Sequence, residues 1–132
     1  MTERLRLLAA DEADLETISA LVQDAAVKRG DIAYDAKARR LVIIANRYRW
    51  ETRQPSRVRC ALRIDSLTRL KRRNWPSSDA VLDLLALRWE NGGIEIDFAG
   101  GAALRADAEC IDVELHDLSG PWGAKRTPRH QL

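Results

Sequence analysis

The stretch "RVRCALRI" (57–64) alternates between two kinds of side chain, and this alternation decides the fold class. Arg or Ala fills every second position, and the positions between them carry Val58, Cys60, Leu62 and Ile64. Successive side chains of a β-strand point to opposite faces, so the pattern is typical of a half-buried antiparallel strand. Alternating or apolar runs also cover residues 3–9, 40–51, 80–90, 94–98 and 102–117. The sequence therefore predicts a mainly β fold of the α+β class, either an antiparallel meander or a partly open barrel.

One short helix is expected near the N-terminus, at residues 11–23. Its apolar residues recur at helical spacing on one face, with Asp11 or Asp14 available to cap the start; they are Leu15, Ile18, Leu21 and Val22. Part of this segment reads equally well as a strand running through residues 20–27. Strand counting favours a pleckstrin-homology-like arrangement for the whole.

Turn chemistry separates the predicted strands. Breaks are expected at "DAKAR" (35–39), "TRQPS" (52–56), "NWPSS" (74–78) and "AGG" (99–101), and Asn91-Gly92 is a strong hairpin signal. The alternation slips at residues 65–66 and again at 110–111, where a β-bulge or a turn between strands is expected. Residues 1–118 are predicted to form one domain, followed by an irregular tail at 119–132.

The Arg-Trp-Glu triplet occurs twice, at 49–51 and 88–90, and suggests a weak internal duplication. Both copies continue to an Ile-Asp pair and then to another Trp, so that residues of about 40–75 align with about 81–122. Two such halves would pack around a shared core. Coincidence between two short β patterns is the alternative. In either case the tryptophans are expected in the structural core; they are Trp50, Trp75, Trp89 and Trp122.

Four strings carry a resemblance to a known family: "NRYRWE" (46–51), "DFAGG" (97–101), "ECID" (109–112) and "ELHDL" (114–118). They resemble the pattern of a domain-of-unknown-function family of short proteobacterial proteins, over nearly the whole chain. The resemblance implies a single-domain cytoplasmic protein. It brings no catalytic residues and no activity with it.

Charge is distributed unevenly along the chain. Residues 28–73 contain 15 Lys and Arg against 4 Asp and Glu, whereas the other residues contain 7 against 16. Arginine is suited to bidentate contacts with phosphate or carboxylate groups. If the strands pair, the basic side chains are expected to form one sheet face that binds an anion or a partner; its members are Arg47, Arg49, Arg57, Arg59, Arg63, Arg69, Lys71 and Arg73, with Arg72 beside them.

Two interpretations of this basic face compete. In the first, acidic side chains from the second half of the chain neutralise it through cross-strand ion pairs, which contribute about 0.2–1 kcal/mol each. In the second, the face stays open and docks an acidic protein surface, with an RNA or nucleotide phosphate group as the alternative ligand. Sparse aromatic residues speak against single-stranded nucleic acid, which usually stacks on them. A purely structural or self-associating protein, including a homo-oligomer, is the third possibility.

Motifs for catalysis are missing from the sequence. There is no GxSxG, no HExxH and no phosphate-binding glycine loop, and the only histidines are His116 and His130. We therefore predict a non-catalytic protein with no cofactor and no metal. The charged N-terminus and the lack of a long apolar run predict a cytoplasmic protein without a membrane association. Cys60 and Cys110 are expected to be reduced, buried, small hydrophobic residues.

Overall fold

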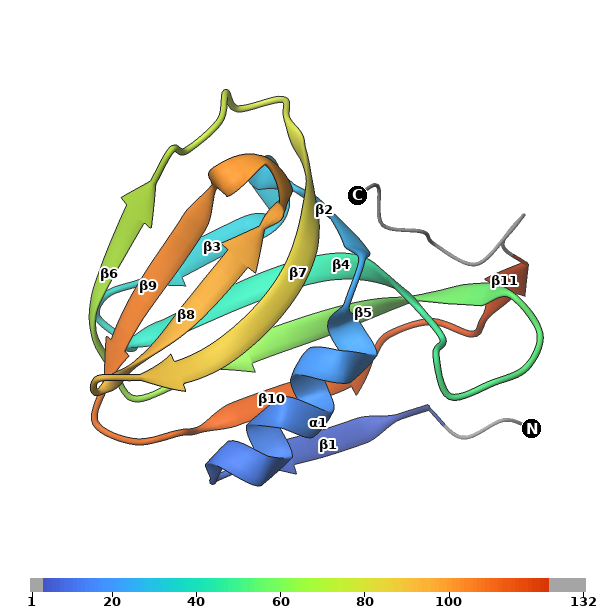
Figure 1. Ribbon diagram of the computed structural model, residues 1–132, viewed down its shortest axis with the longest axis horizontal. Helices are drawn as coiled ribbons and strands as arrows, with labels where there is room; N and C mark the ends of the chain where they lie inside the picture. The colour runs from blue at the N-terminus through green and yellow to red at the C-terminus, as the bar shows by residue number, and fades with distance from the viewer. Residues whose placement is uncertain (1–3, 124–132) are drawn as a thin grey trace.

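The computed structural model describes residues 4–123, which form one helix, eleven strands and two 3₁₀ turns (Figure 1). The helix α1 spans Glu12–Val22, and the 3₁₀ turns span Arg29–Asp31 (η1) and Ala99–Gly101 (η2). The strands are β1 (Arg6–Ala9), β2 (Ala25–Lys28), β3 (Ile32–Asp35), β4 (Arg40–Tyr48), β5 (Ser56–Ile64), β6 (Leu67–Arg73), β7 (Val81–Glu90), β8 (Gly93–Phe98), β9 (Ala103–Ala108), β10 (Val113–Asp117) and β11 (Trp122–Gly123).

All strands belong to one antiparallel sheet with the order β1-β10-β5-β4-β2-β7-β8-β9-β6, while β3 pairs with β4 and β11 with β5. The sheet folds over on itself, so that β7, β8 and β9 lie across from β4 and β5 (Figure 1). β6 does not pair with β3, and the sheet stays open there. The predicted mainly β fold with a partly open sheet and one short N-terminal helix is confirmed.

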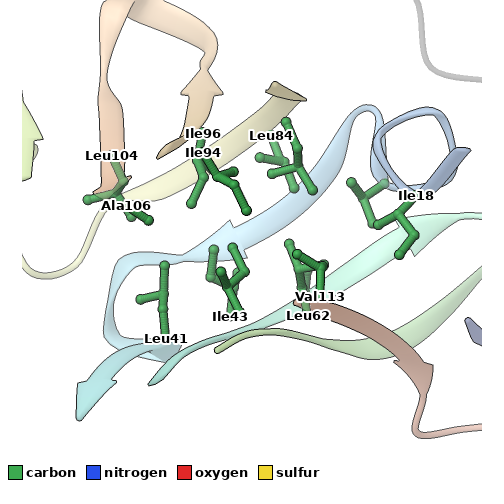
Figure 2. Close-up of a cluster of buried hydrophobic side chains, with 14 of the residues drawn as sticks. Ile18, Leu41, Ile43, Leu62, Leu84, Ile94, Ile96, Leu104, Ala106 and Val113 are labelled. Atoms are coloured by element: carbon green, nitrogen blue, oxygen red, sulfur yellow. The ribbon is translucent and has the colours of Figure 1, made fainter. Parts of the chain in front are cut away.

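Apolar side chains from the two halves of the sheet meet in a single core. Leu41, Ile43 and Leu62 on β4 and β5 face Ile94 and Ile96 on β8, and all of them are almost inaccessible to solvent (Figure 2). The core residues of β4 and β5 are those that alternate in the sequence, and the arginines of β5 point the other way. Burial of the apolar face therefore sets the strand register, because a slip of one residue would turn arginine inward.

The helix α1 covers one open end of this core. Leu15, Ile18 and Val22 are buried beneath it, and Asp11 caps its start by accepting a hydrogen bond of 2.8 Å from the backbone N–H of Asp14. The sequence left a choice between helix and strand for residues 20–27. Both occur, since the helix ends at Val22 and β2 begins at Ala25.

The two slips in alternation are corners at which strands change partner. After β5, the chain turns at Asp65 and Ser66, and β6 pairs with β9; after β9 it turns again, and β10 pairs with β5. The two corners touch each other, because the N–H of Asp65 donates to the carbonyl of Asp112 at 2.9 Å and that of Glu109 donates to Ser66 at 3.1 Å. The Ile-Asp pairs that align in the repeat thus meet in space, although the duplication itself stays a prediction.

The tryptophans differ in their surroundings. Trp75 and Trp89 pack against the core from its margin, and Trp50 donates its indole N–H to the carbonyl of Gln23 at 2.9 Å. Trp122 is 43% exposed, so its assignment to the core is wrong. It begins β11, a two-residue strand that pairs with β5 inside the segment expected to be irregular. The rest of that segment, 124–132, lies outside the described residues.

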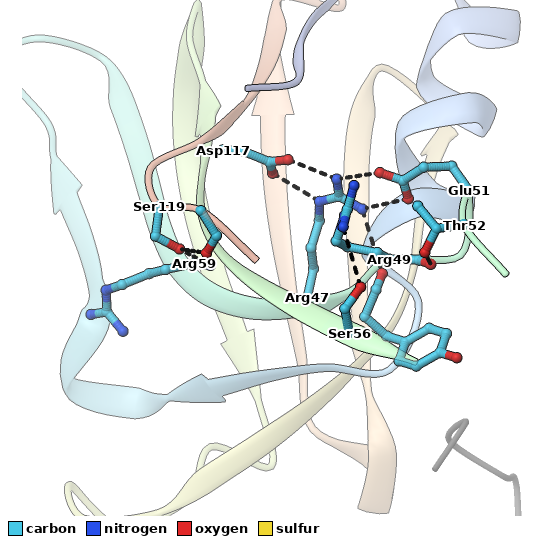
Figure 3. A network of polar contacts seen from close by, with 10 residues as sticks. Arg47, Arg49, Glu51, Thr52, Ser56, Arg59, Asp117 and Ser119 are labelled. Carbon is cyan, nitrogen blue, oxygen red and sulfur yellow. Dashed lines mark hydrogen bonds and ion pairs between the residues drawn. The ribbon is translucent and has the colours of Figure 1, made fainter. Parts of the chain in front are cut away.

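A fully buried arginine stands on β4 beyond the aliphatic core residues of that strand. Arg47 lies on the inner side of β4, has no exposed side-chain surface, and forms two hydrogen bonds of 2.8–2.9 Å with Asp117 (Figure 3). Two further bonds of 2.7 and 3.0 Å go to Glu51, and a weaker one of 3.4 Å goes to the carbonyl of Tyr48. All five N–H groups of the guanidinium therefore have an acceptor. Burial lowers the pKa of Arg47, but the bonds to Asp117 and Glu51 outweigh it and raise that pKa overall.

The cysteines are both free. Cys60 is buried between β4 and β10, as expected, whereas Cys110 lies exposed at the β9–β10 corner, which contradicts its expected burial. Burial raises the pKa of the Cys60 thiol to about 12. The thiolate is the reactive form of cysteine, so this pKa makes Cys60 inert in the folded protein.

Substitution Arg47→Met should strongly destabilise the fold. It leaves the carboxylate of Asp117 buried without its partner, and breaking a buried ion pair in this way costs about 3–5 kcal/mol. The matched control is Arg40→Met, which removes an ion pair between Asp65 and an Arg40 side chain that is 45% exposed. The control should cost much less stability, because solvent screens exposed ion pairs. Urea unfolding of both variants measures the difference, and equal losses would show that the buried cluster is not stabilising.

The contribution of Glu51 to this cluster should disappear in acid. Burial raises the pKa of its carboxyl, but the hydrogen bonds from Arg47 outweigh this and leave the pKa below its ordinary value of 4.5. A carboxyl whose pKa is lower in the folded state stabilises the protein when the pH is above its unfolded-state pKa. This stabilisation is lost as the pH falls through the folded-state pKa. We expect the stability gap between wild type and Glu51→Gln to be largest above pH 4.5 and to narrow below it. Unfolding midpoints measured across this range test the expectation, and a gap that widens in acid contradicts it.

Thiol labelling should distinguish the two cysteines. In the folded protein at mildly alkaline pH, iodoacetamide should modify Cys110 and leave Cys60 untouched, because Cys60 is both inaccessible and protonated. Both should react after unfolding in urea. Mass spectrometry of the labelled peptides gives the result, and rapid modification of Cys60 in the folded state would show that its end of the core opens.

Candidate functional site

The basic residues predicted to share one face are divided among three places. Arg47 is the clearest departure, because it lies inside the core instead of beside Arg57 and Arg59 on the outside. Its place on an exposed anion-binding face is therefore wrong. Strand parity does put it on the side of Leu41 and Ile43, and two carboxylates make burial of the charge tolerable there.

The arginines of β5 point outward as predicted, and partners within the protein engage each of them. Arg63 donates to Glu114 at 3.1 Å on the neighbouring strand β10, and its Nε lies 2.9 Å from Asp65, an ion-pair distance without hydrogen-bond alignment. Arg59 forms an ion pair of 3.6 Å with Asp31. The pair between Arg63 and Glu114 is of the kind that the neutralised interpretation expects, whereas Asp31 and Asp65 belong to the basic segment itself.

Backbone and ring contacts hold the other two arginines of this region. Arg57 donates to the carbonyl of Asn46 at 3.0 Å, and its guanidinium stands 5.9 Å from the centre of the Tyr48 ring. Arg49 lies beyond the end of β4, where its Nη1 donates to the Ser56 hydroxyl at 3.4 Å. Both are therefore partly engaged, without an ion pair of their own among residues 4–123.

The basic residues of β6 form neither an ion pair nor a side-chain hydrogen bond with any residue between 4 and 123, whereas Arg49 and Arg57 do have hydrogen bonds. These β6 residues are Arg69, Lys71, Arg72 and Arg73. β6 pairs with β9 and not with β5, so the expected continuous face across β5 and β6 is wrong. Leu70 and Arg72 share one face of β6 and lie opposite the buried Ala106 and Leu104; Leu70 is half-buried there, and Arg72 stays exposed. Arg69, Lys71 and Arg73 occupy the alternate, outward positions. We call these three the outer β6 row.

Two members of the outer β6 row, Lys71 and Arg69, act electrostatically on the neighbouring strand β9. The carboxyl of Asp107 on β9 has a pKa below its ordinary value, first because Arg105 donates a hydrogen bond of 2.8 Å to it. Slight burial opposes the shift, and the positive charges of Lys71, Arg105 and Arg69 add to it. Asp107 forms its ion pair with Arg105 and not with the outer β6 row. The row therefore keeps an excess of positive charge on an exposed strand.

The unpaired margin between β3 and β6 contains a cavity of about 430 Å³, which we call the seam cavity. Ile32 and Tyr34 line it from β3, and Leu70 and Arg72 line it from β6. The complete lining is Arg29, Gly30, Ile32, Tyr34, Leu70, Lys71, Arg72, Trp75 and Leu104. The cavity thus combines an aliphatic floor, two aromatic rings and three cations, and no acidic residue lines it.

Backbone contacts limit the seam cavity at both ends. At one end the N–H of Leu67 donates to the carbonyl of Arg39 at 3.2 Å, and Arg39 Nε donates back to the carbonyl of Leu67 at 2.9 Å. At the other end the N–H of Arg29 donates to the carbonyl of Ala80 at 3.0 Å. The seam cavity is therefore a bounded window in the wall of the sheet.

Arg29 brings an unsatisfied hydrogen-bond donor to the seam cavity. Its Nε is shielded from solvent and has no hydrogen-bond partner among the residues that the structure describes. A buried donor without an acceptor is costly, and more so when the group is charged. Arg29 and Tyr34 were not among the predicted site residues. They meet Arg72 only through the long-range fold, so no local pattern in the sequence marks them.

Other kinds of site find no support in the described part of the chain. No group of three or more His, Cys, Asp or Glu side chains between residues 4 and 123 is placed to hold a metal ion. His116 is exposed on the outer side of β10, and His130 lies outside the described residues. Within the same limits, no helix has the length and hydrophobicity needed to cross a membrane.

Comparison with known proteins gives a family without an assigned activity. A search of curated proteins and a search of solved structures each found no match to this chain. A family model described as a protein of unknown function, DUF2948, matches residues 5–130 and so covers almost the whole chain. The resemblance seen in the sequence motifs is thereby confirmed at the level of the family. The chain belongs to the DUF2948 family of proteins of unknown function.

Proposed function

We propose that this protein is a non-catalytic binding module that docks an acidic protein surface on the outer β6 row. The observation that carries the proposal is the contrast between two groups of cations. The arginines of β4 and β5 have an ion pair or a side-chain hydrogen bond within the protein, whereas Arg69, Lys71 and Arg73 have neither with a described residue and stand together on an exposed strand. An acidic partner would supply the missing counter-charges.

The position of β6 at the end of the sheet supports docking. Its inner edge pairs with β9, and its outer edge has no strand partner within the described residues. Lys and Arg on such an edge also protect a protein against uncontrolled strand pairing. If protection of the edge were the only role of the row, the protein would be purely structural and the row would bind no specific partner. Specific binding therefore distinguishes the docking function from this structural alternative.

RNA is the alternative ligand of the same row. Phosphate groups match arginine as well as carboxylates do. The outer β6 row, however, contains no aromatic side chain for a base to stack on, and stacking is a usual part of single-stranded binding. We therefore favour the acidic protein partner.

The wider setting is proposed on the sequence features alone. We place the protein in the bacterial cytoplasm as part of this proposal, on the resemblance in its sequence motifs. The pleckstrin-homology-like arrangement and homo-oligomer formation also stay predictions.

Charge reversal on the row should abolish docking. The probe is a short fluorescent peptide of mixed Glu and Leu, measured by anisotropy at low salt. The double substitution Arg69→Glu and Arg73→Glu should weaken binding by at least about tenfold, since juxtaposed like charges cost several kcal/mol. The control Arg4→Glu with Arg53→Glu changes the net charge equally at exposed sites away from β6 and should have little effect.

A second probe distinguishes protein from RNA. A fluorescent oligouridylate should bind more weakly than the acidic peptide at the same salt concentration. If it binds more tightly, with affinity falling along a log–log salt slope of about −0.7 per phosphate neutralised, RNA is the ligand. Equal weakening by both double substitutions would show that only net charge matters, and the docking proposal would fail.

A further inference from the structure

We propose that the seam cavity is a binding site for a small organic anion that carries an aromatic ring. The seam cavity shares Lys71 with the outer β6 row, but it lies in the open margin between β3 and β6 and takes its other lining residues from outside that row. The volume of about 430 Å³ lies within the range of roughly 300–1,000 Å³ that small-molecule sites occupy. A single water molecule takes up only about 30 Å³, so the space is far larger than a hydration site.

The negative charge of the ligand follows from the lining. Arg29, Lys71 and Arg72 surround the cavity, and no carboxylate lines it. The shielded Nε of Arg29 lacks an acceptor among the described residues, so an oxyanion in the cavity would satisfy a donor that folding leaves unsatisfied. Phosphate and carboxylate both provide such an oxygen, and a planar guanidinium binds either of them.

The ring of the ligand follows from the two aromatic walls. Tyr34, on β3, is 40% exposed, and Trp75 lies beyond the end of β6, so they line the cavity from opposite sides. Phe98 packs edge-on against Trp75, with a distance of 5.8 Å between the ring centroids, and helps to hold the indole ring in place. Ile32 and Leu70 pack only at the margin of the core and leave apolar surface in the cavity. A ring would cover this surface and offer its face or edge to the aromatic side chains.

The boundaries of the cavity argue against a peptide strand as its occupant. A strand added between β3 and β6 would have to run along both edges and leave at each end. The contacts between Leu67 and Arg39 close one end, and the contact between Arg29 and Ala80 closes the other. A compact ligand fits such a window, and an extended chain does not.

Naphthyl phosphate and naphthoate are suitable probes, with naphthol and inorganic phosphate as controls for the ring and for the charge. Titration calorimetry on the full chain should show saturable binding of one or both acids and weaker binding, by about tenfold or more, of both controls. The comparison of the two acids identifies the preferred oxyanion. The indole N–H signal of Trp75 should shift in the nuclear magnetic resonance spectrum along the same saturation curve.

Two variants test the assignment of the site. Arg29→Gln removes the charge and should weaken binding of the acids by about tenfold or more, whereas Arg53→Gln, on an exposed loop outside the cavity, should not change it. Tyr34→Ala should also weaken binding, and its exposure makes it a safer change than one at Trp75. The proposal is overturned if neither acid binds saturably, if naphthol binds as tightly as the acids, or if Arg29→Gln binds like wild type.

Discussion

The pairing of β10 with β5 is the constraint on which the other features depend. β10 occupies the edge of β5 along residues from Cys60 to Ile64, so β6 cannot form a hairpin with the strand that precedes it. β6 turns away at Ser66 instead and pairs with β9 on the far side of the core. The sheet then ends at β6, opposite β3, and stays open there. The seam cavity and the exposed basic strand are both results of this exchange of partners.

Local patterns predicted most of the elements and little of their arrangement. Alternation located the strands, Asp11 marked the start of the helix, and Asn91-Gly92 formed the expected hairpin between β7 and β8. The pairing partners could not be predicted, because the paired residues of β6 and β9 lie thirty or more positions apart in the sequence. No local pattern distinguishes β9 from β5 as the neighbour of β6. The aligned Ile-Asp pairs did mark the two corners that meet.

The candidate binding face was predicted from the charge distribution, and the burial of its residues in the structure changes its membership. Charge counting located the basic segment, but it treated all arginines of the segment alike. The structure separates them, because Arg47 is buried in the core, Arg63 is paired on the surface, and Arg72 lines the seam cavity. A strand pattern predicts on which side a residue lies. It does not predict whether that side offers carboxylates, and here these come from Glu51 nearby and from Asp117, seventy residues later.

The distance along the chain between Arg47 and Asp117 has a consequence for biosynthesis. A ribosome delivers the first four or so strands well before it delivers the residue that completes the ligand set of the guanidinium. Until then Arg47 can enter the interior only with Glu51 as its counter-ion, at the cost of unsatisfied donors. Stable closure around Arg47 thus waits until Asp117, seventy residues further along, has left the ribosome.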